Sequence, residues 1–176
     1  LDSAPPVMSE RVRITKPFLT GTAIVDMMVP LGQGQRELVI GDRKTGKSAF
    51  VLSTVKNQVV AGALAVYAAI GKKRSDIKEV EAFFKREGIL DRVVIVATSS
   101  MDAPGFIYLT PYSAMTIAEY FKNQGKNVVV VFDDLSTHAR FYREASLLAK
   151  RFPGRESYPG DIFAIHARLL ERAGNF

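Results

Sequence analysis

Residues 41–48 read Gly-Asp-Arg-Lys-Thr-Gly-Lys-Ser and match the pattern G-x-x-x-x-G-K-[ST], which binds phosphate groups at the start of a helix. The two glycines let successive backbone N–H groups point at one anion. Lys47 adds a charge that can reach the β- and γ-phosphates, and the Ser48 hydroxyl can bind Mg²⁺. The apolar residues 38–40 predict the strand that should precede such a loop. The nucleotide-binding residues that we expect for ATP or ADP are Gly41, Asp42, Arg43, Lys44, Thr45, Gly46, Lys47 and Ser48.

A second acidic element of the site is predicted at Asp133, which follows the β-branched run of residues 128–132. Ligands of open α/β sheets gather at the carboxyl ends of the strands. Four apolar residues followed by aspartate are typical of the Walker-B strand, whose aspartate holds Mg²⁺. Aspartate is also common at the ends of strands because its side chain forms hydrogen bonds in turns, so this pattern alone is weak evidence for a metal ligand. The complete phosphate-binding motif at residues 41–48 makes the Walker-B interpretation stronger. We therefore predict Ser48 and Asp133 as the Mg²⁺ ligands, and expect Asp134 to orient water or to cap the next helix.

The composition is that of one globular domain. The chain has 176 residues, a formal net charge of +6 and no cysteine, which excludes disulfides, thiolate catalysis and cysteine-based zinc sites. The positive charge suits a polyanionic ligand or partner, but the lysines and arginines are dispersed and do not distinguish a nucleotide from a nucleic acid or an acidic protein. No apolar run has the length needed to span a bilayer.

Apolar runs alternate with stretches of helical spacing along the chain. We expect strands at residues 38–40, 64–70, 93–97 and 128–132. We expect helices at about residues 24–31, 48–62, 75–88, 110–125, 136–152 and 161–174, the fourth with Thr110 as its N-cap and Pro111 in its first turn. Strands that are apolar throughout are buried on both faces, and helices between them imply parallel crossovers. The pattern therefore predicts an α/β fold with a mainly parallel sheet and helices on both faces.

Several further stretches have distinctive sequences: residues 32–38, 69–75, 132–136, 153–161 and 169–173. Together with residues 41–48 they resemble the α subunit of the rotary, proton-translocating ATP synthase, over about residues 12–173. The start Gly-Asp-Arg of the loop resembles α subunits, whereas the catalytic β subunits of that family carry a Gly-Gly-Ala type of loop. The resemblance implies a RecA-like P-loop NTPase core, truncated at its C-terminal end. Residues 1–17 would then be a linker or a strand leading in from a missing N-terminal domain, and residues 18–176 a partial nucleotide-binding domain.

The resemblance also implies a site that binds nucleotide without hydrolysing it, so we assign no catalytic residue. In the catalytic β subunits of the family a glutamate within Gly-Glu-Arg activates water, but the matching stretch here is Gly71-Lys72-Lys73. Family α subunits usually have glutamine at the position of Lys72. A protonated lysine cannot act as a base; it can pair with a γ-phosphate or simply be solvated, and both interpretations stay open. Lys44 and His138 also stand where glutamine is common, and we expect His138 to be a surface or partly packed residue without a catalytic role.

The partners implied by the resemblance are catalytic β-type subunits in an alternating ring, and a central rotor shaft. The loop from Pro153 to Asp161 would contact the shaft, although such a loop can also be an ordinary connection between helices. In the family, a strand between the loop strand and the Walker-B strand, an arginine finger and part of the adenine pocket follow the stretch 169–173, so none is expected here. No nucleic acid is expected. The membrane would be reached only indirectly, through a peripheral complex on the cytoplasmic side in bacteria or on the matrix or stromal side in an organelle.

Three other interpretations compete with a non-catalytic nucleotide-binding subunit. The loop at residues 41–48 can be a glycine turn with solvated lysines that binds nothing, which the complete pattern disfavours. An active ATPase of the same fold, such as a secretion-type motor, is disfavoured by the Gly-Lys-Lys stretch. A Rho-like RNA translocase would need basic and aromatic residues clustered together, and the sequence has no such cluster.

Overall fold

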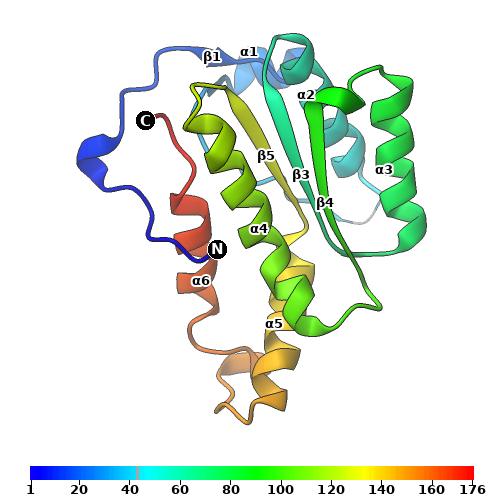
Figure 1. The fold of residues 1–176 in the computed structure, drawn as a ribbon, viewed down its shortest axis with the longest axis vertical. Coiled ribbons are helices and arrows are strands. Elements are labelled where there is room, and N and C mark those ends of the chain that lie inside the picture. The colour runs from blue at the N-terminus through cyan, green and yellow to red at the C-terminus, as the bar shows by residue number, and fades with distance from the viewer. Residues whose placement is uncertain (43) are drawn as a thin grey trace.

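The computed structural model describes residues 1–42 and 44–176, and a parallel three-stranded sheet lies at its centre (Figure 1). In the order β4-β3-β5, the strands are β4 (Val93–Ser99), β3 (Leu64–Lys72) and β5 (Val128–Asp133). Ala65 of the central strand pairs with Val93, and Leu64 pairs with Val128. Because the strands are parallel, their carboxyl ends meet at one edge of the sheet, which is where ligands of α/β sheets bind.

Helices cover both faces of this sheet. The long helices are α2 (Lys47–Val60), α3 (Arg74–Arg86), α4 (Pro104–Lys122), α5 (Leu135–Leu148) and α6 (Ile162–Glu171). Helices α2 and α3 pack on one face, and α4 and α5 on the other (Figure 1). The prediction of a mainly parallel α/β sheet with helices on both faces is confirmed.

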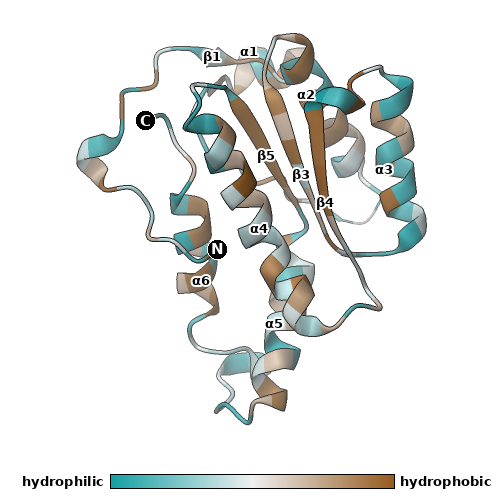
Figure 2. Ribbon diagram, in the orientation of Figure 1, coloured by the Kyte–Doolittle hydropathy of each residue, from teal (hydrophilic) through white to brown (hydrophobic). Residues whose placement is uncertain are grey.

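The central strand β3 is buried on both sides, as its unbroken apolar sequence predicts. Residues 65–70 are all buried, and successive side chains point to opposite faces. Tyr67 and its alternate neighbours contact Val55 of α2 and Phe84 of α3. Ala68 and Ile70 contact Ile107 and other residues of α4. Figure 2 shows the three strands as largely hydrophobic, whereas the helices around them alternate between hydrophobic and hydrophilic residues.

The other elements are short. They are η1 (Met8–Glu10), β1 (Pro17–Phe18), α1 (Ala23–Met28), β2 (Leu31–Gly32), η2 (Leu90–Arg92) and η3 (Arg155–Ser157). Strands β1 and β2 form a separate antiparallel pair. Helix α6 packs on α4 and α5 through Ile165 and Leu169. None of the helices in the described part of the chain is both long and apolar enough to span a bilayer.

The predicted strand at residues 38–40 is wrong. This run has no strand geometry, and Leu38 and Ile40 are 76% and 85% exposed. A strand exists through hydrogen bonds to a neighbour, and in the described sheet β5 pairs only with β3. The apolar sequence alone therefore does not produce a strand at this position.

Two helix boundaries differ from the prediction by four residues or more, and the other boundaries differ by less. Helix α4 begins at Pro104, which takes the first-turn position, and Pro111 lies buried inside the helix. Thr110 is not an N-cap: its hydroxyl donates to the Phe106 carbonyl at 2.9 Å, within the helix. Helix α5 ends at Leu148 rather than at residue 152, because the chain turns at Lys150, whose φ is 54°.

Candidate nucleotide-binding site

The glycine-rich loop leads directly into helix α2. Gly46 is the residue before the helix, and its φ of 90° lies in the left-handed region that favours glycine. Because α2 begins at Lys47, the first N–H groups of the helix, which have no partner within it, lie at the end of the loop. The Thr45 hydroxyl donates to the Asp42 carbonyl at 2.8 Å and closes the turn. The predicted residue Arg43 lies outside the described residues.

The Lys47 side chain is folded over the loop. Its ammonium group donates to the backbone carbonyl oxygens of Gly41 and Asp42. An ammonium group has three donors, so with two of them on these carbonyls one donor remains for an anion. The role of Lys47 in binding a phosphate group stays a prediction.

Asp133, at the end of β5, is held by two residues of β3. The Tyr67 hydroxyl donates to its Oδ2 at 2.7 Å, and Lys72 Nζ lies 2.6 Å from its Oδ1. Tyr67 is only 1% exposed, and this burial together with the charge of Asp133 raises its pKa, so that the hydroxyl stays protonated and donates. Two adjacent parallel strands therefore bring together a carboxylate from the end of β5, an ammonium group from the end of β3 and a phenol from the middle of β3.

Lys72 also contacts Asp134, with Nζ 3.1 Å from Oδ2. Burial alone lowers the pKa of Lys72, but its contacts with Asp133 and Asp134 outweigh the burial and raise it. Asp134 caps α5, as expected, because its Oδ1 accepts a hydrogen bond from the Thr137 N–H at 2.6 Å. Neither interpretation of Lys72 from the sequence included this pairing with two carboxylates. The signal that could have indicated it is the position of both groups at carboxyl ends of parallel strands.

One cavity of about 430 Å³ brings the predicted metal ligands together. Ser48, at the start of α2, lines it together with Asp133, Tyr67 and Lys72, and α3 forms the rest of its wall. Hydroxyl and carboxylate oxygens are suitable donors for Mg²⁺, which usually binds one or two carboxylates together with phosphate oxygens. However, both oxygens of Asp133 already have partners, and one of these partners is a cation. Among residues 1–42 and 44–176, no group of three or more His, Cys, Asp or Glu could hold a metal ion.

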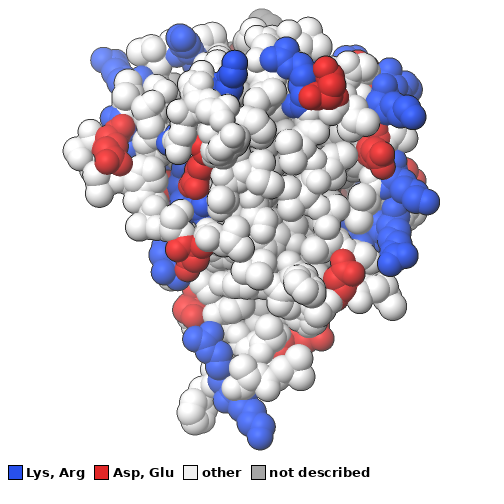
Figure 3. All heavy atoms as spheres, in the orientation of Figure 1, with Lys and Arg blue, Asp and Glu red and all other residues white. Residues whose placement is uncertain are grey.

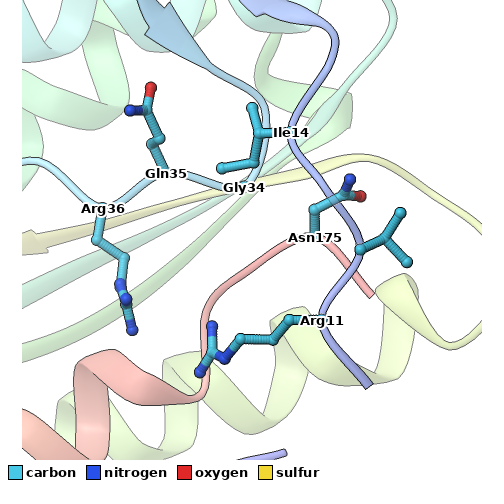
Figure 4. Close-up of a pocket in the computed structure, with 7 residues that line it drawn as sticks. Arg11, Ile14, Gly34, Gln35, Arg36 and Asn175 are labelled. Atoms are coloured by element: carbon cyan, nitrogen blue, oxygen red, sulfur yellow. The ribbon is translucent and has the colours of Figure 1, made fainter. Parts of the chain in front are cut away.

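A second cavity, of about 300 Å³, lies away from these residues and is lined by the N-terminal segment, the turn after β2 and the C-terminal segment (Figure 4). Two arginines on its wall, Arg11 and Arg36, pair with Glu171 at 2.9 and 3.0 Å. Gly34 permits the close approach, since a Cβ there would lie 2.6 Å from the Asn175 nitrogen. We interpret this cavity as part of the contact that ties the two ends of the chain together.

His138 is not the surface or partly packed residue that the sequence suggested. It is fully buried, its Nδ1 lies 2.9 Å from His166 Nε2, and its ring stacks on Tyr108. Burial, together with the neighbouring His166, lowers its pKa to about 4. The cluster lies between α4, α5 and α6 and serves packing.

The loop of residues 153–161 forms the tip of the molecule beyond α5 (Figure 1). The Tyr142 hydroxyl donates to Asp161 Oδ2 at 2.9 Å, and Arg151 donates to the Tyr142 hydroxyl at 2.7 Å. Phe152, just before the loop, is 98% exposed. The role of this loop as a rotor contact stays a prediction.

Charged side chains on the face seen in Figure 3 agree with the dispersed pattern in the sequence. Lysines and arginines lie along the edges of this face with acidic residues among them, and its middle, over α4, is uncharged. This face has no continuous basic surface of the kind that follows a nucleic acid backbone.

An α/β sheet covered on both faces, with a glycine-rich loop at the start of a helix and an aspartate at the carboxyl end of a parallel strand, defines the class of P-loop nucleotide-binding domains. Within this class, the sequence model of the ATP synthase alpha/beta family, nucleotide-binding domain, matches residues 21–176. The chain belongs to this family.

Curated relatives point to one branch of the family. The chain is 51% identical over 170 residues to ATP synthase subunit alpha 2 of Nitrosospira multiformis, covering 97% of this chain and 33% of that protein. It is 50% identical over 168 residues to ATP synthase subunit alpha 1 of Shewanella frigidimarina, covering 96% and 32%. It is 48% identical over 168 residues to ATP synthase subunit alpha of Clostridium botulinum, covering 96% and 33%. The chain thus spans about a third of the length of the curated relatives it matches.

Proposed function

We propose that this chain is the nucleotide-binding domain of an α-type subunit of a rotary ATP synthase, and that it binds ATP or ADP without hydrolysing it. The absence of hydrolysis is supported by one observation. The ammonium group of Lys72, at the end of β3, lies 2.6 Å from the carboxylate of Asp133, at the end of β5. Hydrolysis needs a group that positions and activates water in line with the γ-phosphate. A lysine whose ammonium form is stabilised by two carboxylates cannot accept a proton from water. The relatives named alpha subunits support the same assignment.

The phosphate groups would be held by residues 41–48, through the backbone N–H groups of the loop and the ammonium group of Lys47. The predicted Mg²⁺ ligands, Ser48 and Asp133, line the same cavity, but Lys72 and Tyr67 already contact Asp133, so a metal ion would bind this carboxylate only in place of one of these partners. When bound, the metal supplies positive charge that neutralises phosphate oxygens.

The assembly that we propose rests on the resemblance to alpha subunits. Catalytic β-type subunits would alternate with this subunit in a ring, and the loop from Pro153 to Asp161 would face the rotor shaft. In this assembly, residues 1–17 lead in from a preceding domain and residues 18–176 belong to the nucleotide-binding domain. The complex would lie at the membrane periphery, on the cytoplasmic side in bacteria or on the matrix or stromal side in an organelle.

The test is the affinity of the full-length polypeptide for ADP, measured by titration calorimetry in the presence of Mg²⁺. Lys47→Ala removes the charge over the loop and should weaken binding by at least about tenfold, which corresponds to about 1.4 kcal/mol. Lys126→Ala is the matched control, because Lys126 is an exposed lysine at the opposite end of β5. Equal affinity of wild type and Lys47→Ala would show that residues 41–48 do not hold the phosphates.

The non-catalytic assignment is tested on the same preparation. ATP turnover by the polypeptide alone should stay at background in wild type and in Lys47→Ala. Turnover that Lys47→Ala abolishes would instead favour the alternative, an active RecA-like ATPase.

A further inference from the structure

Lys72 pairs with Asp133, the aspartate that the sequence predicts as a metal ligand. Its Nζ is 2.6 Å from Asp133 Oδ1 and 3.1 Å from Asp134 Oδ2, and the side chain is only 21% exposed. It lines the same cavity as Ser48. The cation therefore lies between the two carboxylates, in a cavity that the predicted metal ligand Ser48 also lines.

A magnesium ion would compete with this arrangement. Mg²⁺ requires near-octahedral geometry and gives up its water reluctantly. To use Asp133 it would have to displace the ammonium group from Oδ1 or the Tyr67 hydroxyl from Oδ2. Beside an ammonium group that stays in place, it would also meet a like charge in a partly buried site, where charges are poorly screened.

The ammonium group can do part of what the metal does. In P-loop sites the metal adds positive charge between an aspartate and the phosphate oxygens. Lys72 carries a positive charge at the wall of the cavity, held there by Asp133 and Asp134. Lys47 supplies a second one on the loop side. One cation is therefore fixed at the wall of the cavity and another on the glycine-rich loop that leads into α2.

We propose that Lys72 replaces Mg²⁺ at this site, so that the domain binds metal-free ADP about as tightly as it binds MgADP. This inference rests on the proposed function, since it concerns the same nucleotide site. It specifies that the ligand is a nucleoside diphosphate without a bound metal ion. The observation behind it is the ion pair between Lys72 and Asp133, and not the motif at residues 41–48.

The experiment compares the dissociation constant of ADP with excess Mg²⁺ and with EDTA, on the full-length protein. Binding that is lost in Lys47→Ala is assigned to this domain, which separates it from any other nucleotide site in a complex. For wild type the two constants should agree within about threefold. For Lys72→Gln, which removes the charge and frees Asp133, ADP should bind at least about tenfold more tightly with Mg²⁺ than with EDTA.

Two variants control this comparison. Lys73→Gln removes a neighbouring exposed lysine that lies outside the cavity, and should behave like wild type. Lys72→Arg keeps the charge and can pair bidentately with Asp133, so it should also remain insensitive to Mg²⁺. The electron paramagnetic resonance of Mn²⁺, used as a probe for the metal, gives an independent readout: ADP should bring bound Mn²⁺ to the Lys72→Gln site and not to the wild-type site.

The outcomes separate the two proposals. Strong Mg²⁺ dependence of wild type, or equal dependence of wild type and Lys72→Gln, would overturn the replacement of the metal and leave nucleotide binding intact. Absence of any Lys47-dependent ADP binding, with Mg²⁺ or EDTA, would overturn both. The wild-type comparison alone decides the matter if Lys72→Gln does not fold.

Discussion

The buried side chain of His138 makes the stability of this fold depend on pH. Its Nε2 lies 3.1 Å from the carbonyl oxygen of Tyr108, which can only accept, so Nε2 carries the proton and Nδ1 accepts from His166. This arrangement needs a neutral imidazole at position 138. Burial, and then the neighbouring His166, lower its pKa to about 4.

We expect the free energy of unfolding to fall as the pH drops from about 6.5 to about 4. In the unfolded chain His138 takes up a proton near its ordinary pKa of about 6.5, whereas in the folded protein it stays neutral until about pH 4. The stabilisation is therefore complete above pH 6.5 and is lost at up to about 1.4 kcal/mol per pH unit below it. Urea unfolding at a series of pH values measures this slope.

His138→Gln is the comparison for that slope, since glutamine does not titrate. Carboxylates protonate in both proteins, so the difference between the two slopes isolates the histidine. The variant should show a shallower loss of stability between pH 6.5 and 4. Identical slopes would mean that His138 does not keep its low pKa in solution.

At the scale of elements, Gly71 allows the end of β3 to pack closely against α4 and α5. Its φ is 58°, and a Cβ at this position would lie 2.9 Å from Phe141 Cε2 and 3.0 Å from Thr137 Cγ2. The next residue is Lys72, so the close packing also determines where the ammonium group meets Asp133. The geometry of the candidate site therefore depends on a residue that has no side chain.

Gly71→Ala should destabilise the protein more than Gly88→Ala does. Both glycines have positive φ, but nothing lies within 4 Å of a Cβ added at Gly88. The backbone conformation alone costs about 1–2 kcal/mol for alanine in either position. At Gly71 the clash with two side chains adds about 1–3 kcal/mol. Urea unfolding of the two variants measures the difference, and equal losses would show that α5 moves aside without cost.

At the scale of the whole molecule, burial and regular hydrogen bonding are greatest around β3 and low in residues 35–42, which lead into the glycine-rich loop. Residues 65–70 are buried between two helical layers, whereas residues 35–42 have no regular structure and are exposed. Backbone amides without buried hydrogen bonds open at little cost, and those of a central strand open only with the whole domain.

Hydrogen exchange should follow this gradient. We expect the amides of β3 to exchange most slowly and those of residues 35–42 to exchange within the shortest labelling times. Addition of ADP should slow exchange in the first turn of α2, because its N–H groups would then bind phosphate. Mass spectrometry of labelled peptides measures both effects. Protection of residues 35–42 equal to that of β3 would contradict the gradient.

The sequence by itself was sufficient for features whose causes are local. Helix α2 after the loop, the buried strand β3 and the cap formed by Asp134 all follow from apolar spacing, glycine positions and capping chemistry within a few residues. The resemblance to alpha subunits of ATP synthase rested on short motifs of the same kind, and the family match over residues 21–176 confirms the family. The nucleotide and metal roles of residues 41–48 and Asp133 stay predictions.

The tertiary structure decided what depends on a partner elsewhere in the chain. Residues 38–40 have the composition of a strand, but among the described residues no neighbouring strand forms hydrogen bonds with them. His138 is buried because Tyr108 and His166, from other helices, surround it. Lys72 pairs with Asp133 because β3 and β5 are adjacent and parallel. A strand, a buried ring and an ion pair are each made by two segments, and only the packed fold brings those segments together.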